Sequence, residues 1–124
     1  MGEPYKIGDL AREFDVTLRT LRFYEDRGIL DPQRSGSTRL YSETDRSRLQ
    51  IALFCKRIGL SLAEIGQVME LFEKAPTDLD VRRKLKSIYH NQLHTLRDEK
   101  NKMDETIADL QHKLDELDSR QYPQ

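Results

Sequence analysis

A chain of 124 residues with 36% hydrophobic and 35% charged residues has room for one globular domain and an appendage, and its core is thin. The net charge of −1 argues at first sight against nucleic acid, but between residues 17 and 60 nine basic residues, eight of them Arg, stand against five acidic ones. The single cysteine, Cys55, excludes an internal disulfide, and without a signal region or a membrane-length apolar run we expect a soluble cytoplasmic protein.

Two short helices are expected near the N-terminus. Apolar residues recur at helical spacing from residue 7 to residue 14, and Asp15-Val16 then makes a tight turn. Thr17 is a suitable N-cap for a second helix over residues 18–27, which Gly28 ends because glycine readily adopts the left-handed conformation. The apolar face of the first helix consists of Ile7, Leu10, Ala11 and Phe14.

The second helix has two different sides. On a helical wheel Leu18, Leu21 and Glu25 share one of them. The opposite side carries Arg19, Thr20, Phe23 and Arg27. Two arginines, a threonine and a phenylalanine are unusual for a merely solvated surface, and the planar guanidinium suits phosphates and guanine edges. We therefore expect this helix to face DNA.

Residues 31–41 are expected to form a small β-hairpin. Pro32 cannot continue a helix, and Ser35-Gly36 is typical of a turn. The flanking residues form two short strands, so that Arg34 and Arg39 lie near the tip of the hairpin. Such a hairpin is the wing of a winged helix-turn-helix.

Two further helices follow the wing. Ser42 with Asp45 resembles a capping box, with Asp in place of the usual Glu or Gln, and opens a third helix that ends at Ile58. Ser61 with Glu64 is a second capping box and opens a fourth helix, so the two form a second helix-turn-helix-like unit. The apolar face of the fourth helix consists of Leu62, Ile65, Val68, Met69 and Phe72.

A long helix with an apolar seam is expected from residue 78 to about residue 119, with Thr77 or Asp78 as its N-cap. It would reach roughly 60 Å at about 1.5 Å per residue. The seam residues alternate four and three apart with one polar interruption, Lys100, as in a coiled coil. A lone solvated helix would leave the leucines in water, so we expect a second copy of the chain to cover them. The seam consists of Tyr89, Leu93, Leu96, Met103, Ile107, Leu110, Leu114 and Leu117.

Four segments of the chain stand in a characteristic order and spacing. They read Tyr-Lys-Ile-Gly-Asp-Leu-Ala at 5–11, Thr-Leu-Arg-Phe-Tyr-Glu-Asp-Arg-Gly-Ile-Leu at 20–30, Arg-Leu-Tyr at 39–41 and Ile-Gly-Leu-Ser-Leu-Ala-Glu-Ile at 58–65. Together they resemble the MerR family of transcription regulators, with a match that runs through residues 5–72. Residues 9–17 further resemble regulators of branched-chain amino acid and acyl-CoA catabolism in proteobacteria.

The resemblance implies a mainly α-helical fold in three parts. Residues 1–75 would be a winged helix-turn-helix DNA-binding domain with a small β-hairpin wing. Residues 76–119 would be a dimerisation helix in a coiled coil, which the family builds antiparallel, and residues 120–124 a tail. The seam alone leaves the direction of the coiled coil open.

The resemblance also implies how the chain holds DNA. The second helix enters the major groove, while the wing and the second helix-turn-helix grip the flanking backbone. Arg22 and Tyr24 match the family's backbone-contacting pair, and Phe23 beside them can stack or pack on sugar but cannot donate a hydrogen bond. The implied DNA-binding residues are Thr17, Arg19, Thr20, Arg22, Phe23, Tyr24, Arg34, Arg39, Tyr41 and Arg57.

Three of these residues have a structural alternative. Arg22 could pair with Glu25 or Asp26 at helical spacing. Phe23 could belong to the core if the helix is rotated, and Tyr41 could pack under the wing without touching DNA.

The family mechanism gives the expected partners: promoter DNA, a second copy of the chain and RNA polymerase. The dimer binds a pseudo-palindrome in a promoter with an overlong spacer, and it bends and untwists the DNA to bring the two promoter elements into register. Smooth bending of a site of this size costs on the order of 1–6 kcal/mol, supplied by many backbone contacts.

The sequence predicts no cofactor and leaves the signal open. Metal-responding relatives carry cysteines at the start of the dimer helix and beyond its end, where this chain has none, and Cys55 is most simply a small buried residue. His90, His94 and Asp98 share a helix face but lack a fourth ligand, so we predict no metal site. An unknown small-molecule effector would use the dimer interface or a region outside these 124 residues. Without an effector the protein would be a simple repressor.

Three other classes of protein agree less well with the sequence. An enzyme is not expected, because the sequence has no Gly-rich phosphate loop, no thiol with a histidine partner and no paired carboxylates in an apolar setting. An excisionase-like DNA-architecture protein shares the winged helix but usually lacks a dimerising helix of this length. A coiled-coil scaffold leaves the arginine face of residues 19–27 unexplained.

Overall fold

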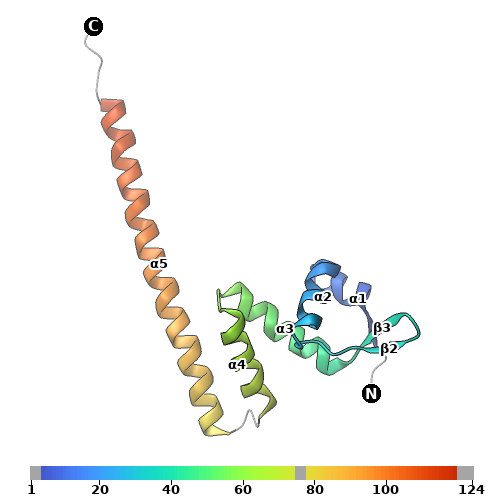
Figure 1. The fold of residues 1–124 in the computed structure, drawn as a ribbon. Coiled ribbons are helices and arrows are strands. Elements are labelled where there is room, and N and C mark those ends of the chain that lie inside the picture. The colour runs from blue at the N-terminus through green and yellow to red at the C-terminus, as the bar shows by residue number, and fades with distance from the viewer. Residues whose placement is uncertain (1–3, 75–77, 120–124) are drawn as a thin grey trace. The chain divides into compact units, whose positions relative to one another are not determined.

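The computed structural model describes residues 4–74 and 78–119 (Figure 1). It is mainly α-helical, as predicted, with one small sheet. The elements in chain order are β1 (Tyr5–Lys6), α1 (Ile7–Phe14), α2 (Leu18–Asp26), β2 (Gln33–Ser35), β3 (Thr38–Tyr41), α3 (Glu43–Arg57), α4 (Leu62–Glu73) and α5 (Leu79–Ser119). The predicted domain boundary at 75–76 and the tail at 120–124 fall outside the described residues.

Capping hydrogen bonds and turns define the ends of α1 and α2. The main-chain N–H of Lys6 donates to Asp9 at 3.0 Å at the start of α1, and Asp15 turns the chain after it in the left-handed region at φ 52°. Thr17 caps α2, its hydroxyl accepting from the N–H of Thr20 at 3.0 Å. Gly28 follows α2 with φ 76°, a conformation that costs a residue with a Cβ atom more than glycine.

The wing is part of a three-stranded antiparallel sheet of order β1-β3-β2. Figure 1 labels the two strands of its hairpin, β2 and β3. The hairpin of β2 and β3 was predicted, with Arg34 opposite Arg39 in its register. The third strand, β1, was not, although it pairs Tyr5 with Tyr41 across the sheet. Two residues directly before a helix carry no strand period, so only their distant partner shows that they form one.

Both predicted capping boxes are present, but they differ in burial. Ser61 and Glu64 form an exposed box at the start of α4. Asp45, at the start of α3, is only 5% exposed and accepts from the hydroxyl and the N–H of Ser42 and from the N–H of Asp31. Its carboxylate therefore ties the segment that enters the wing to the beginning of α3.

A hydrophobic core joins the helices to the sheet. Arg48 of α3 links the elements around this core: it donates to the carbonyl of Ile29 at 2.6 Å and forms an ion pair with Glu73 of α4. A cation at carbonyls that follow a helix satisfies acceptors that the helix leaves open. The largest fully buried side chains are Tyr24, Tyr41, Leu10, Leu21, Leu30, Leu49, Ile65, Val68 and Cys55.

The chain forms two compact units, and their boundary along the sequence lies within α5. The first ends at Leu85 and the second begins at Lys86, so the first turns of α5, with buried Val81 and Leu85, belong to the first unit. Asp78 caps α5, accepting from the N–H of Asp80 at 2.8 Å, whereas Thr77 lies outside the described residues. Among the described helices, none is both long and apolar enough to cross a membrane.

Candidate nucleic-acid interface

The outward side of α2 is a free cationic surface. Leu21 and Tyr24 turn inward, with 0% and 1% exposure, so Arg19, Arg22 and Phe23 stand toward solvent. Within residues 4–74 and 78–119, the guanidinium groups of Arg19 and Arg22 form no ion pair or hydrogen bond. The alternative in which Arg22 pairs with Glu25 or Asp26 is therefore not observed.

Phe23 lies on the surface of α2 and not in the core. It is 40% exposed, and the guanidinium carbon of Arg27 lies 4.9 Å from the centre of its ring. Its edge meets the ring of Tyr24, with centroids 5.7 Å apart. Arg27 thus covers one face of an aromatic ring at the edge of the arginine surface, which is a cation–π arrangement.

The start of α2 has the predicted Thr17 cap, but Leu18 beside it is more exposed than expected. The hydroxyls of Thr17 and Thr20 lie 2.9 Å apart, and that of Thr17 also accepts the N–H of Thr20, so both groups are engaged in capping the helix. Leu18, which the helical wheel placed with the core residues, is 41% exposed. Leu18 is the first residue of the helix, directly after the turn, and at such an end position a helical wheel overestimates the burial of the side chain.

Glu25 connects α2 to the wing. Arg39 Nε donates to both of its carboxylate oxygens, at 2.9 and 3.3 Å, and Arg34 Nη2 lies 3.8 Å from it. The Arg39 side chain is only 24% exposed and that of Arg34 is 53% exposed. Arg39 therefore acts within the protein, holding the wing against α2, whereas Arg34 keeps much of its guanidinium in solvent.

Two of the sequence-predicted DNA residues are core residues. Tyr24 is 1% exposed and Tyr41 is 0% exposed, so neither ring offers a surface to DNA. Tyr41 follows the alternative of packing under the wing, and its hydroxyl donates to Glu25 at 3.4 Å. Burial and the nearby Glu25 carboxylate raise the pKa of Tyr41 to about 12, because both oppose the phenolate.

The stability of the first unit should fall in alkaline solution. The pKa of Tyr41 rises from 10.0 to about 12 on folding, so the folded state favours the neutral phenol more than the unfolded state does. The contribution of Tyr41 to the free energy of unfolding is therefore complete below pH 10 and is lost as the pH rises through 12, because the unfolded chain ionises first. Urea unfolding followed by circular dichroism should therefore show a declining free energy of unfolding across this range. Y41F, which cannot ionise there, should decline less steeply. An identical pH dependence in both proteins would contradict the role of Tyr41.

The third predicted contact region lies between α3 and α4. Arg57 ends α3, is exposed and has no side-chain partner among the described residues. Gly59 then turns the chain at φ 89°, and Ser61 opens α4. Like those of Arg19 and Arg22, the guanidinium group of Arg57 is thus free within the described residues, and it lies at the turn of the second helix-turn-helix.

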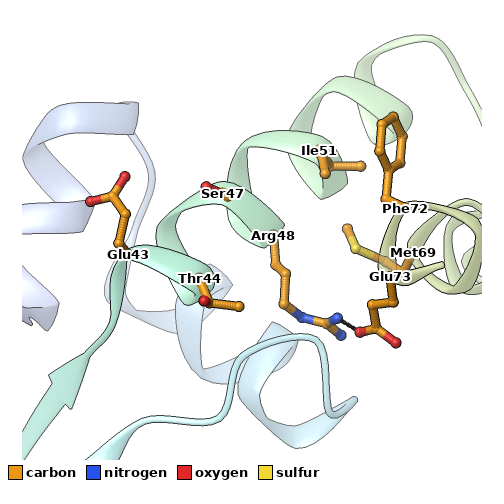
Figure 2. Close-up of a pocket in the computed structure, with 8 residues that line it drawn as sticks. All are labelled: Glu43, Thr44, Ser47, Arg48, Ile51, Met69, Phe72 and Glu73. Carbon is orange, nitrogen blue, oxygen red and sulfur yellow. Dashed lines mark ion pairs between the residues drawn. The ribbon is translucent and has the colours of Figure 1, made fainter. Parts of the chain in front are cut away.

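Two hollows of the first unit were not predicted. One, of about 360 Å³, lies between β1, α1 and the wing, and Arg12 and Thr38 are among its lining residues. The other, of about 370 Å³, is an open groove between α3 and α4 (Figure 2). Figure 2 shows Arg48 reaching across this groove to Glu73, beside Met69 and Phe72. Both hollows join segments distant in sequence, so no local motif marks them.

Cys55, His90 and His94 are the residues that the sequence offered for sensing an effector or a metal ion. Cys55 is buried and carries a free thiol, whose pKa is raised by burial. His90 and His94 are exposed on α5. In the described part of the chain, no group of three or more His, Cys, Asp and Glu side chains is arranged to hold a metal ion.

The seam residues of α5 form an uncovered apolar stripe in the single chain. Tyr89 is half-buried, and the rest are exposed, from 39% for Leu96 to 64% for Leu117. Side chains of this size normally leave water, at a gain of about 1.5–3 kcal/mol each. The stripe thus has the apolar composition of a helix–helix interface.

Two protein-family models together match nearly the whole described chain. The family model described as "MerR HTH family regulatory protein" matches residues 5–71, and the one described as "MerR, DNA binding" matches residues 46–120. The first covers the sheet and the helices up to α4, and the second covers α3 to the end of α5.

Individual relatives agree with the family models. The HTH-type transcriptional regulator YfmP of Bacillus subtilis is 33% identical over 120 residues, which cover 93% of this chain and 79% of that protein. The ZntR homolog of Haemophilus influenzae is 37% identical over 68 residues, 53% of this chain, which spans half the length of that protein. The solved structure of HiNmlR, "a MerR family regulator lacking the sensor domain, bound to promoter DNA", superposes with a TM-score of 0.62 at 25% identity, covering 90% of this chain and 79% of that one.

Proposed function

Because this chain belongs to the MerR family of DNA-binding transcription regulators, we propose that α2 is its major-groove helix and that the free guanidinium groups of Arg19 and Arg22 contact the duplex. The observation that carries the proposal is the outward side of α2, where these groups have no partner in the described chain. A cation without an internal partner is available to a phosphate or a base edge at no cost of a broken ion pair.

The contacts divide by position. Arg19, in the first turn of α2, is suited to base edges, and Arg22, one turn on, to the backbone. Phe23 packs on sugar with Arg27 above it. Arg34 and Arg57 contact flanking phosphates. Thr17 and Thr20 act first by shaping the start of α2, and Arg39 positions the wing through Glu25. Tyr24 and Tyr41 are left out of the interface because they are buried.

Members of the family bind promoter DNA and act as dimers, and α5 supplies the surface for this. In a dimer joined through the second units, the first units of the two protomers reach two half-sites of a promoter and can distort the DNA spacer between them. Bending the spacer costs on the order of 1–6 kcal/mol, which phosphate contacts on both sides must offset. The free arginines of the first unit are the groups available for these contacts.

Replacing Arg22 with alanine tests the backbone role. Affinity should fall by a similar factor for the specific site and for random duplexes, and the slope of log K against log salt should decrease by about 1 per protomer. Fluorescence anisotropy from 50 to 200 mM salt measures both. K102A removes one positive charge from the second unit and should leave the slope nearly unchanged. Unaltered affinity of R22A for random DNA would exclude the phosphate contact.

The finer assignment concerns the regulated genes. The resemblance of residues 9–17 supports control of branched-chain amino acid and acyl-CoA catabolism. Binding to promoters of such genes, with and without acyl-CoA thioesters, tests this assignment. An effector-free repressor is the second candidate: the DNA-bound relative is described as lacking the sensor domain, so promoter binding in that protein does not need one.

A further inference from the structure

The groove between α3 and α4 brings an ion pair and apolar side chains together in one small site (Figure 2). Arg48 of α3 and Glu73 of α4 form the ion pair across it. Ile51, Met69 and Phe72 line the same groove and form its apolar wall. The DNA contacts proposed above use none of these residues, so they leave the groove without a role.

The ion pair has hydrogen-bonding groups to spare. An arginine side chain carries five N–H groups. Nε of Arg48 donates to the carbonyl of Ile29 at 2.6 Å, and Nη2 donates to that of Gly28 at 3.4 Å. Since Nη1 is engaged by Glu73, two of the five N–H groups remain within the described residues. The Glu73 side chain is 60% exposed, so its carboxylate can accept further hydrogen bonds.

Two neighbouring charges of opposite sign are complementary to a zwitterion. At neutral pH a free α-amino acid carries a carboxylate and an ammonium group on the same carbon atom. When the carboxylate faces Arg48 and the ammonium group faces Glu73, the four charges alternate in sign and each attracts its neighbours. A ligand with a single charge would be attracted by one residue of the pair and repelled by the other.

We propose that the groove binds a small aliphatic α-amino acid such as leucine, whose side chain packs against Ile51, Met69 and Phe72. The volume of about 370 Å³ lies near the lower end of the range of about 300–1,000 Å³ that is usual for ligand pockets. It therefore suits an amino acid better than a far larger acyl-CoA thioester. The hydroxyls of Thr44 and Ser47, which also line the groove, are available to the ligand carboxylate.

Arg48 connects this groove with α2. The carbonyls of Gly28 and Ile29, which accept from Arg48, follow directly on the end of α2. A ligand that bridges Arg48 and Glu73 therefore strengthens the link between the end of α2 and the end of α4. The amino acid thus acts as an effector of promoter binding. This effector role rests on the DNA-binding function proposed above, whereas the binding of the amino acid does not.

Methionine methyl NMR of the full-length chain tests the site. The chain has three methionines, of which Met69 lines the groove, and the variant M69L identifies its signal. Leucine should shift the Met69 signal with a dissociation constant on the order of 0.1–1 mM, because exposed charge pairs contribute modestly. The signal of Met103, on α5, should stay in place. A Met69 signal that does not respond to millimolar leucine would overturn the proposal.

Three compounds related to leucine test each part of the ligand. Isocaproate lacks the ammonium group, isoamylamine lacks the carboxylate, and glycine lacks the apolar side chain. Each should bind at least about tenfold more weakly than leucine. Equal binding of isocaproate or isoamylamine would contradict recognition of a zwitterion. Equal binding of glycine would contradict the contact with the apolar wall.

E73Q removes the charge that attracts the ammonium group and keeps the size of the side chain. It should raise the dissociation constant of leucine by about threefold to thirtyfold. E70Q is the matched control, because Glu70 is exposed on α4 and does not line the groove. Thermal unfolding followed by circular dichroism shows whether both variants are folded. Unchanged leucine binding by folded E73Q would show that the ligand site lies elsewhere.

The effector role is measured by fluorescence anisotropy with promoter DNA. Saturating leucine should change the promoter affinity of the unmodified protein by about fivefold or more. The affinity of E73Q should change less at the same leucine concentration. Leucine that binds the groove and leaves promoter affinity unchanged would overturn the effector role.

The remaining outcomes separate this site from the proposed function. Promoter binding without a leucine shift of Met69 would overturn the amino acid site and leave the DNA-binding function standing. A leucine shift without promoter binding would do the reverse. A Met69 signal that depends on protein concentration and not on leucine would show that a second copy of the chain covers the groove, which also overturns the amino acid site.

Discussion

Replacing Asp45 with alanine is expected to lower the free energy of unfolding of the first unit by about 2–4 kcal/mol. The carboxylate is 5% exposed and accepts three hydrogen bonds, from the N–H of Asp31 and from the N–H and the hydroxyl of Ser42. Alanine leaves these donors without an acceptor in a place that water does not reach easily. The change also removes half of the capping box of α3.

The second capping box of the same chain is the matched control. Glu64 accepts only from the N–H of Ser61 and is more exposed, so E64A should cost less than about 1 kcal/mol. D45N keeps one acceptor oxygen and should fall between the two. Urea unfolding at a fixed protein concentration measures all three, because dimerisation makes stability depend on concentration. Equal losses for D45A and E64A would show that burial of Asp45 adds nothing.

Replacing Leu110 with aspartate is expected to convert the protein into a monomer at micromolar concentration and to abolish specific promoter binding. Leu110 lies on the seam and is 62% exposed in the single chain. Both protomers lose an apolar contact of about 1.5–3 kcal/mol, and each gains a carboxylate facing an apolar residue. The dimer dissociation constant should rise by at least about a hundredfold, since each 1.4 kcal/mol is a factor of about 10.

The control introduces the same charge on the other side of α5. Ala108 is exposed, and its position points away from the seam, so A108D should remain a dimer and bind the promoter nearly as well as the unmodified protein. Size-exclusion chromatography with light scattering gives the oligomeric state, and mobility shift gives DNA binding. Weak non-specific binding of monomeric L110D should persist, because its arginines are intact. A dimeric L110D would place the dimer contact elsewhere.

Most of the secondary structure was predictable because its signals are local. Thr17 as cap of α2, Gly28 after that helix, and the two capping boxes at Ser42 and Ser61 are all found in the structure as predicted. Each depends on groups within a few residues of one another along the chain. The missed element, β1, depends on a partner in the wing that is far away in sequence.

The side chains of the site were harder to predict than the helices that carry them. Tyr24 and Tyr41 are polar at one end, so their residue type is compatible with both a DNA contact and a core position. Arg39 is as suitable for a phosphate as Arg34, but only Arg39 lies within hydrogen-bond distance of Glu25. No spacing rule distinguishes these cases, because the partner in each case comes from another element.

By itself, the sequence determined the helices, the caps of α2, α3 and α4, the arginine-bearing side of α2 and the apolar seam of α5. These follow from periodicity and from main-chain groups that find partners nearby along the chain. Only the tertiary structure decided which arginines remain free, which tyrosines are buried, and that Asp45 and Glu25 hold the wing in place. Such properties depend on which distant segments come together, and burial then sets the cost of leaving a polar group without a partner.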